Sequence, residues 1–245
     1  MQAHVQAHVQ AYVYGSKREL PASFDAYGSP DRAVIVSIDM HRGHLDEGSP
    51  CPAPRARDIV APIDAFHDRA RALGVPIVHV RTVLREGGVD DVNGRPAAWR
   101  SVFPLHVGPI PNADEHAIEG TCWTELVTRV APGDLMVSGK KRLSAFHPTD
   151  LDFLLRNLRA ETLILNGGFT DCCVLNTAFE GSNLGYRIVV LRDLVRGTDE
   201  AMEAAALKMV SLHLGLVMDS DDLLGRWTEA GPDAARGQGR LRTVA

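Results

Sequence analysis

The segment Thr162–Phe179, TLILNGGFTDCCVLNTAF, joins a short apolar run to two glycines and two adjacent cysteines. The run TLILN is short and continuously apolar, which is typical of a strand buried on both faces of a parallel sheet. Gly167 and Gly168 allow the backbone to turn tightly after this run. Thr170 or Asp171 then serves as the cap of a helix. The segment therefore predicts a strand that turns directly into a helix, with both cysteines in the first helical turn.

The same alternation of strand and helix recurs along the chain. Apolar runs that predict strands are AVIVSI before Asp39, VPIVHV ending at Val80, DLMVSG before Lys140, RIVVL before Arg192 and a weaker LGLVM from Leu214. Between them, residues 57–74, 149–160 and 198–215 have apolar positions three or four apart, which is the helical period. This order predicts one doubly wound α/β domain with a roughly six-stranded parallel sheet and helices on both faces.

The α/β pattern divides the chain into parts. We assign residues 31–228 to the α/β domain and, within it, residues 85–132 to a loop-rich insertion that overhangs one edge of the sheet. Residues 1–30 form an N-terminal extension with a QAHV-QAHV-QAYV tandem, whose valines recur every fourth position. This spacing leaves two alternatives open, a helical stripe that packs on another subunit or a frayed terminus. Residues 229–245 are predicted to be a mobile tail.

Composition excludes several classes of protein. The chain has 245 residues, 45% of them hydrophobic and 23% charged, which is enough to bury a core without disulfides or metal ions. A net charge of -5 gives no reason to expect nucleic acid or an anionic membrane as a partner. The first residues lack the basic and apolar regions of a signal peptide and no run of about 18 apolar residues occurs, so neither a signal peptide nor a membrane-spanning helix is expected. The 4 cysteines are too few for a disulfide framework, so we expect free thiols in the cytoplasm.

Three reactive side chains follow three of the predicted strands. Asp39 follows the first, Lys140 follows the third, and the turn with Cys172 and Cys173 follows the fourth. Because ligands of open parallel sheets bind beyond the carboxyl ends of the strands, we expect an acid, an amine and a thiol on one rim. Neighbours on a helix project about 100° apart, so only one cysteine points into the crevice, and the spacing does not say which. The alternative is two inert, buried thiols.

Three segments resemble the signature blocks of the isochorismatase-like cysteine hydrolases: IVSIDMHRGH, VSGKKRLSAFHPTDLDFLL and NGGFTDCCVLNTAFEGSNLGYRIVVLRD. That family includes nicotinamidases, N-carbamoylsarcosine amidohydrolase and hydrolases of biuret and ureidoacrylate. The resemblance runs from about residue 33 to residue 224 and implies a Rossmann-like, three-layer fold. It also implies a catalytic triad of Asp39, Lys140 and Cys173. Cys172 then fills a variable position, and Lys141 is a solvated neighbour.

Each implied role has a physical reason. A thiol with the ordinary pKa of about 8.5 is mostly protonated at neutral pH, so Cys173 needs a base or a positive field. Asp39 would take the thiol proton, and we expect burial to raise its pKa enough for this role. Lys140 would offset the negative charge. The resemblance implies the backbone N–H groups of Phe169 and Cys173 as the oxyanion hole, with a cis peptide bond before Phe169.

The chain departs from the family pattern around the substrate pocket. His41 replaces the usual Gln and His44 an aromatic residue, which implies a pocket that donates hydrogen bonds; the alternative is two solvated histidines. Phe146 is a further predicted pocket residue. The metal-binding nicotinamidases carry an Asp-x-His arrangement with another His after the second strand, and HVRTVLREGG lacks it, so no metal and no cofactor is expected. The aromatic residues of the insertion are predicted to be local core, with a lid over the crevice as the alternative: Trp99, Phe103 and Trp123.

The sequence therefore predicts a cysteine-dependent amidohydrolase. It would cleave a non-peptide C–N bond of a small amide, ureido or carbamoyl compound through a thioester and release ammonia or an amine. The resemblance also implies a homo-oligomer, either a dimer or a tetramer. Two alternatives stay open, a vinyl ether hydrolase of the isochorismate type and a non-catalytic binding or scaffold protein. Cys173 weighs against the first, because members with that chemistry dispense with the cysteine.

Overall fold

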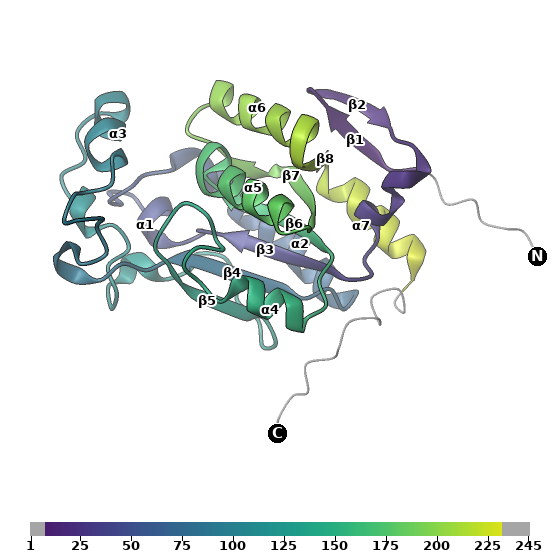
Figure 1. The fold of residues 1–245 in the computed structure, drawn as a ribbon, viewed down its shortest axis with the longest axis horizontal. Helices are drawn as coiled ribbons and strands as arrows, with labels where there is room; N and C mark the ends of the chain where they lie inside the picture. The colour runs from purple at the N-terminus through teal and green to yellow at the C-terminus, as the bar shows by residue number, and fades with distance from the viewer. Residues whose placement is uncertain (1–7, 232–245) are drawn as a thin grey trace, which may run out of the picture.

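A six-stranded parallel sheet forms the centre of the computed structural model, which describes residues 8–231. The strand order is β5-β4-β3-β6-β7-β8 (Figure 1). The strands are β3 (Ala33–Ile38), β4 (Ile77–Thr82), β5 (Leu135–Lys140), β6 (Thr162–Gly168), β7 (Arg187–Arg196) and β8 (Gly215–Met218). All residues of β3 and β6 are buried, which explains why their sequences are apolar without alternation. The predicted doubly wound α/β fold is confirmed.

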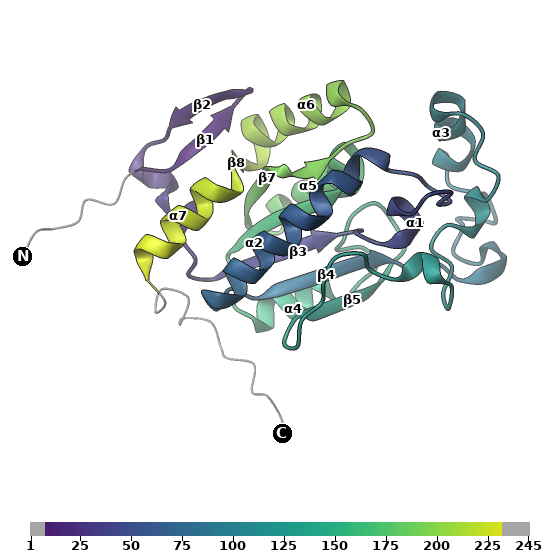
Figure 2. The same cartoon turned by 180° about the vertical axis from the view of Figure 1, so that it is seen from behind.

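Helices cover both faces of this sheet. On one face lie α2 (Val60–Ala72) and α7 (Ser220–Ala230), in front in Figure 2. On the other lie α4 (Leu151–Asn157), α5 (Leu175–Asn183) and α6 (Glu200–Met209), in front in Figure 1. Successive strand residues point to opposite faces. Ile35 therefore joins the core under α2, and Val34 and Val36 join the core under α5.

The helix α2 shows how the sequence pattern sets the packing. Ile59, Ile63, Phe66 and Ala70 recur at helical spacing, and all four are buried against the sheet. Burying each of the large side chains contributes roughly 1.5–3 kcal/mol relative to leaving it in water. The helix ends at Ala72, and Gly74, two residues later, has a φ of 79°, the left-handed conformation common just after helix ends.

The N-terminal segment differs from the prediction. β1 (Gln10–Val13) and β2 (Ser16–Glu19) form an antiparallel hairpin, so the four-residue spacing of the valines does not produce a helix. Val9 and Ala11 are buried in the core of the same domain, and the Tyr12 hydroxyl donates a hydrogen bond to Asp219. The hairpin therefore packs on its own chain. Residues 1–7, and residues 232–245 of the predicted tail, lie outside the described residues.

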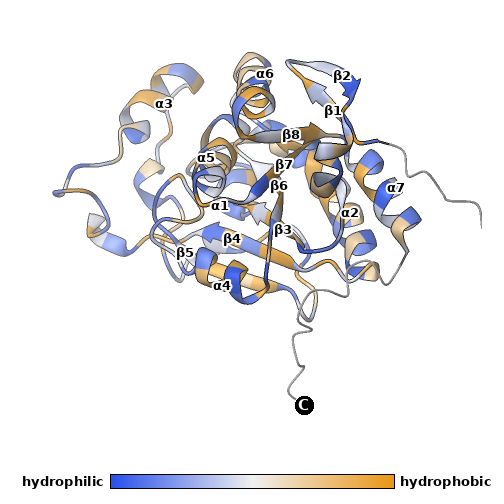
Figure 3. Ribbon diagram, turned by 45° about the vertical axis from the view of Figure 1, so that its right-hand side comes forward, coloured by the Kyte–Doolittle hydropathy of each residue, from blue (hydrophilic) through white to orange (hydrophobic). Residues whose placement is uncertain are grey.

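The insertion lies beyond the carboxyl ends of the strands. Its main helix, α3 (Trp99–Val107), stands apart from the sheet, near the one-turn helix α1 (Arg42–Leu45) that follows β3 (Figures 1 and 2). It carries hydrophobic residues despite this distance (Figure 3), and its Leu105 is 85% exposed. The insertion therefore covers the rim at which the site was predicted. Within residues 8–231, no helix is both long and apolar enough to cross a membrane.

Candidate active site

The three predicted catalytic side chains meet at the carboxyl edge of the sheet. Asp39 directly follows β3, Lys140 ends β5, and Cys173 lies in the turn after β6. The Lys140 Nζ lies 2.6 Å from the Asp39 Oδ2 and 3.3 Å from the Cys173 Sγ. Their exposed fractions are 1% for Asp39, 2% for Lys140 and 6% for Cys173. The ammonium group thus touches both a carboxylate and a sulfur within a buried cluster.

A fourth side chain, Thr82 at the end of β4, completes this cluster and was missed by the sequence analysis. Its backbone N–H and its hydroxyl donate hydrogen bonds of 2.9 and 3.0 Å to the Asp39 Oδ1. The same hydroxyl accepts a hydrogen bond of 2.9 Å from Lys140. Thr82 therefore fixes the orientation of the carboxylate and the ammonium at once. The available signal was its place at the carboxyl end of the second strand, on the rim where Asp39 and Lys140 were expected.

The turn that carries the cysteines depends on Gly167. Its φ is 113°, and a Cβ at this position would lie 2.1 Å from the Ile38 carbonyl oxygen. Only glycine allows β6 to approach β3 this closely. The peptide bond between Gly168 and Phe169 is cis, as the resemblance implied.

The conformation after this turn corrects one prediction. Residues Thr170–Val174 form a π-helical turn that leads into α5, where the first turn of an α-helix was expected. Among the described residues, neither Thr170 nor Asp171 caps it with a side-chain hydrogen bond. The Asp171 carboxylate instead accepts two hydrogen bonds of 2.7 Å from the N–H and hydroxyl of Thr198, after β7. The Cys173 carbonyl also accepts a hydrogen bond of 2.7 Å from Thr177.

The pKa of Asp39 differs from the prediction. Burial alone would raise the pKa of Asp39, but the Lys140 ammonium holds it well below its usual range. The prediction of a raised pKa was wrong because it considered burial without this counter-ion. Burial likewise opposes the charge of Lys140, yet Asp39 and Cys173 raise its pKa. The resting site therefore contains an ion pair.

The nucleophile candidate has the opposite tendency. The neighbouring Cys172 and burial raise the pKa of Cys173 well above its ordinary value, and Lys140 only partly opposes this. The resting thiol is therefore protonated and needs a base before it can attack.

Lys141, the second lysine of the pair, is not solvated as predicted. Its ammonium donates a hydrogen bond to the Val83 carbonyl and lies 3.7 Å from the Asp90 carboxylate.

A cavity of about 740 Å³ lies against Cys173 and Lys140. Phe169 forms part of its wall, and the insertion contributes Trp99 and Phe103. The rings of Phe103 and Phe169 meet edge to face at 6.1 Å. The insertion therefore does more than form local core, because two of its aromatic side chains face the cavity.

Phe146 does not have the predicted role in the pocket. It packs in the core beneath the sheet, where its ring stacks on Tyr186 at 6.0 Å. Among the described residues, Phe146 does not line the cavity, whereas Leu143 does. Phe146 follows Lys140 by six residues, and the chain turns back into the core before reaching it.

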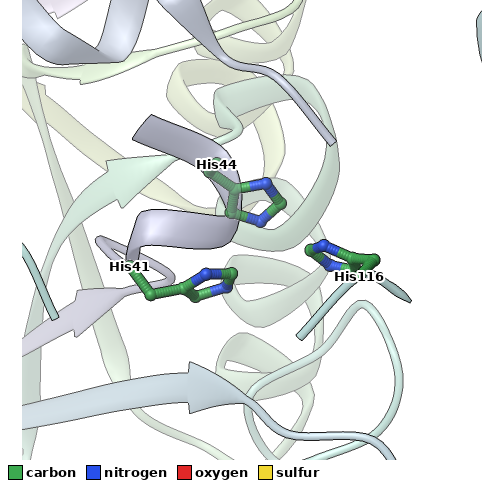
Figure 4. Close-up of side chains that lie close together, drawn as sticks. All are labelled: His41, His44 and His116. Atoms are coloured by element: carbon green, nitrogen blue, oxygen red, sulfur yellow. The ribbon is translucent and has the colours of Figure 1, made fainter. Parts of the chain in front are cut away.

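Three histidines form a buried group at one side of the cavity. His41 and His44 are 0% and 5% exposed, so the alternative of two solvated histidines is wrong. Their rings stack with centroids 4.4 Å apart, and His116 of the insertion lies 4.8 Å from the His44 ring (Figure 4). Burial lowers the pKa of all three. His116 was missed because the insertion has no periodicity from which its position could be inferred.

Comparisons with known proteins agree with this fold. Residues 33–222 match the family model described as the isochorismatase domain. N-carbamoylsarcosine amidase of an Arthrobacter species is 28% identical over 169 residues, which cover 69% of this chain and 61% of that protein. Ureidoacrylate amidohydrolase RutB of Pseudomonas syringae is 26% identical over 226 residues, 87% of this chain and 91% of that protein.

A solved structure shows the same fold. The cysteine hydrolase from Pseudomonas syringae pv. phaseolicola matches with a TM-score of 0.72 at 23% identity, over 82% of this chain and 94% of that one. The fold and the family match define the class: the chain belongs to the isochorismatase family. Its two curated relatives above are named as an amidase and an amidohydrolase, which are hydrolases that act on C–N bonds.

Proposed function

We propose that this protein is a cysteine-dependent amidohydrolase that cleaves a small carbamoyl, ureido or amide compound. The observation that carries the proposal is the Lys140 ammonium in contact with both the Asp39 carboxylate and the Cys173 sulfur, beside an accessible cavity. The names of the relatives, an N-carbamoylsarcosine amidase and a ureidoacrylate amidohydrolase, support a carbamoyl or ureido group in the substrate. A cytoplasmic location and a homo-oligomer stay predictions from the sequence.

In the first half of the reaction, the Cys173 sulfur attacks the carbonyl carbon while Asp39 takes the thiol proton. A C–S bond forms, and the carbonyl oxygen gains the negative charge. We infer that the N–H groups of Phe169 and Cys173 bind this oxyanion, since they start the turn after β6. Asp39 then gives its proton to the departing nitrogen, the C–N bond breaks, and ammonia or an amine leaves.

In the second half, water attacks the thioester carbonyl. Asp39 removes a proton from this water, the C–S bond breaks, and the proton returns to the Cys173 sulfur. The product acid and the resting thiol are formed together. Each proton that leaves one group is taken up by another, so the cycle needs no oxidant and no reductant.

Lys140 explains how a carboxylate with a lowered pKa serves as the base. When the proton moves from sulfur to Asp39, the negative charge moves from one partner of the ammonium to the other. Lys140 is therefore never left without an anion, although it is buried. Because two unit charges at this distance interact strongly inside a protein, keeping this pairing lowers the cost of forming the thiolate.

The experiment compares three cysteine variants in an assay for released ammonia. The substrates to be screened are N-carbamoyl amino acids, ureidoacrylate, biuret, nicotinamide and maleamate. Cys173→Ala should abolish turnover, Cys172→Ala should retain a substantial part, and Cys122→Ala, at an exposed position, should match the wild type. Undiminished turnover by Cys173→Ala would disprove the mechanism.

Thiol alkylation separates the enzyme from a scaffold on the same fold. An enzyme should show rapid alkylation of Cys173 that a bound substrate prevents. A scaffold should show no such selectivity and no substrate protection.

A further inference from the structure

The three buried histidines come from two parts of the chain that meet only in the folded protein. His41 precedes α1, His44 lies within it, and His116 follows the short 3-10 turn Ala113–Glu115 of the insertion. One ring nitrogen from each residue can be chosen so that all of them lie within 4.8 Å of one another. Figure 4 shows the three rings directed toward one another. This buried arrangement of three imidazole rings raises the question of what the rings bind.

The local structure holds two of these rings in place. His41 and His44 are three positions apart, so they lie on the same side of the turn. The His44 Nδ1 is 2.8 Å from the Cys51 carbonyl oxygen, which fixes the proton on Nδ1 and leaves Nε2 with its lone pair. A ring nitrogen held by a carbonyl in this way is typical of histidines that bind metal ions.

Close packing supports the same arrangement. Gly43 separates the two histidines, and a Cβ there would lie 2.8 Å from the Trp123 carbonyl oxygen and 3.0 Å from the His41 Nδ1. Only glycine lets the insertion close against His41. The Trp99 ring meets His116 edge to face at 5.3 Å and supports the third ring from the side.

Two ring nitrogens of the cluster lack hydrogen-bond partners. Within the described part of the chain, the His41 Nε2 and the His116 Nδ1 are buried and accept or donate no hydrogen bond. Burial of such atoms without a partner costs free energy. A ligand bound between the three rings would offset this cost.

We propose that His41, His44 and His116 form a binding site for a divalent transition-metal ion of the zinc type. Three neutral imidazoles suit Zn²⁺, and three protein ligands leave a fourth position open in tetrahedral geometry. Zn–N bonds of about 2.0–2.1 Å place the ligand nitrogens roughly 3.4 Å apart. Since the nitrogens lie within 4.8 Å of one another, the rings must approach by up to about 1.4 Å on binding.

The surroundings indicate where the open position points. His44 and His116 line the same cavity as Lys140 and Cys173, so the fourth position faces the substrate. The Asp39 Oδ1 lies 3.9 Å from the His41 Nε2 and provides nearby negative charge, while Lys140 is bound to the other carboxylate oxygen. The metal ion would hold an oxygen or nitrogen atom of the substrate and orient it toward the sulfur.

This ligand set is not the Asp-x-His arrangement of metal-binding nicotinamidases that was considered from the sequence. That arrangement includes a histidine after the second strand, where this chain has Thr82 and Val83. Here two ligands come from the turn after the first strand and the third from the insertion.

The test measures metal binding directly and does not depend on turnover. The full chain is freed of metal with a chelator and titrated with Zn²⁺ by calorimetry. Co²⁺ is used as a second probe, because its visible absorption reports tetrahedral coordination. The wild type should bind one equivalent with a tetrahedral Co²⁺ spectrum. His44→Gln and His116→Gln should each weaken binding by about 100-fold or more.

Two controls make each outcome decisive. His106→Ala, an exposed histidine of the same insertion, should leave Zn²⁺ affinity unchanged. Cys173→Ala should also bind Zn²⁺ normally, since sulfur is not in the proposed ligand set. Circular dichroism identifies variants that fail to fold, and for these His41→Gln replaces the failed variant. Absence of stoichiometric binding by the wild type, or binding lost in Cys173→Ala but kept in the histidine variants, would overturn the proposal.

Discussion

The substitution Thr82→Val tests the hydrogen-bonded cluster of Asp39, Lys140 and Cys173. Valine keeps the branched shape that suits a strand end but removes the hydroxyl, which donates to Asp39 at 3.0 Å and accepts from Lys140 at 2.9 Å. The backbone N–H of residue 82 still bonds the carboxylate, and Lys140 still contacts Asp39 and Cys173. The variant should therefore fold and retain the ion pair, with a less well fixed geometry.

The magnitude follows from the contacts that are lost. Hydrogen bonds to charged groups contribute about 1.5–3 kcal/mol each, and these two share one hydroxyl in one network, so we expect a loss of about 2–3 kcal/mol in the free energy of unfolding. For a chain of this length this lowers the melting temperature by roughly 5–10 °C. If half of this free energy is also lost from the stabilisation of the transition state, kcat falls about tenfold.

The assay combines urea unfolding with steady-state kinetics. Thr82→Ser is the matched control, because it keeps the hydroxyl and removes only a methyl group, and it should stay within about 1 kcal/mol of the wild type and near its kcat. A Thr82→Val protein with wild-type stability and wild-type kcat would refute the view that this hydroxyl orients the ion pair.

Three further predictions concern the buried groups around the sheet. Asp39→Asn should reduce turnover by at least about 100-fold in the ammonia assay and lower the free energy of unfolding by about 3–5 kcal/mol, because a buried ammonium loses its counter-ion; turnover above a tenth of wild type would contradict this. Gly167→Ala should lower the free energy of unfolding by more than about 3 kcal/mol in urea, because its Cβ would meet the Ile38 carbonyl oxygen at 2.1 Å, whereas Gly168→Ala, with nothing nearer than 3.7 Å, should cost far less. Burial, with a smaller contribution from the imidazole of His79 in β4, lowers the pKa of His67 from 6.5 to about 3. Since the folded state keeps this ring neutral, its contribution to the free energy of unfolding is complete above pH 6.5 and is lost at about 1.4 kcal/mol per pH unit as the pH falls toward 3. His67→Gln should remove this part of the pH dependence when unfolding is followed between pH 6 and pH 4. An unchanged pH dependence would contradict the assignment.

The sheet, and the meeting of Asp39, Lys140 and Cys173 at its edge, could be predicted because the strand signals are local. Buried parallel strands need continuous apolar runs, and the rule that strand ends share one rim brings together residues distant in sequence, such as Asp39 and Lys140. The choice of Cys173 over Cys172 came from the family resemblance and not from spacing. Thr82 obeyed the same rim rule, but a threonine at the end of a strand is common and carries no chemical signal of its own.

The remaining features depend on tertiary contacts or on competing local rules. The position of His116 is set by packing against Trp99, which an aperiodic loop does not reveal. In the N-terminal segment, the valine spacing left a helical stripe or a frayed terminus open, but Tyr14 and Gly15 adopt φ values of 51° and 88°, the conformation of a tight hairpin turn. The pKa of Asp39 was misjudged because one neighbouring charge outweighs burial.

The division between the sheet and the insertion has a consequence for how this enzyme could change its substrate. Asp39 directly follows β3, Lys140 ends β5 and Cys173 lies in the turn after β6, so the elements of the central sheet position all three groups. Trp99, Phe103 and His116 belong to one continuous loop-rich segment that contacts the cavity from outside. Replacing that single segment would exchange much of the recognition surface at once while leaving the reactive groups untouched, so new specificities are accessible by loop exchange without rebuilding the chemistry.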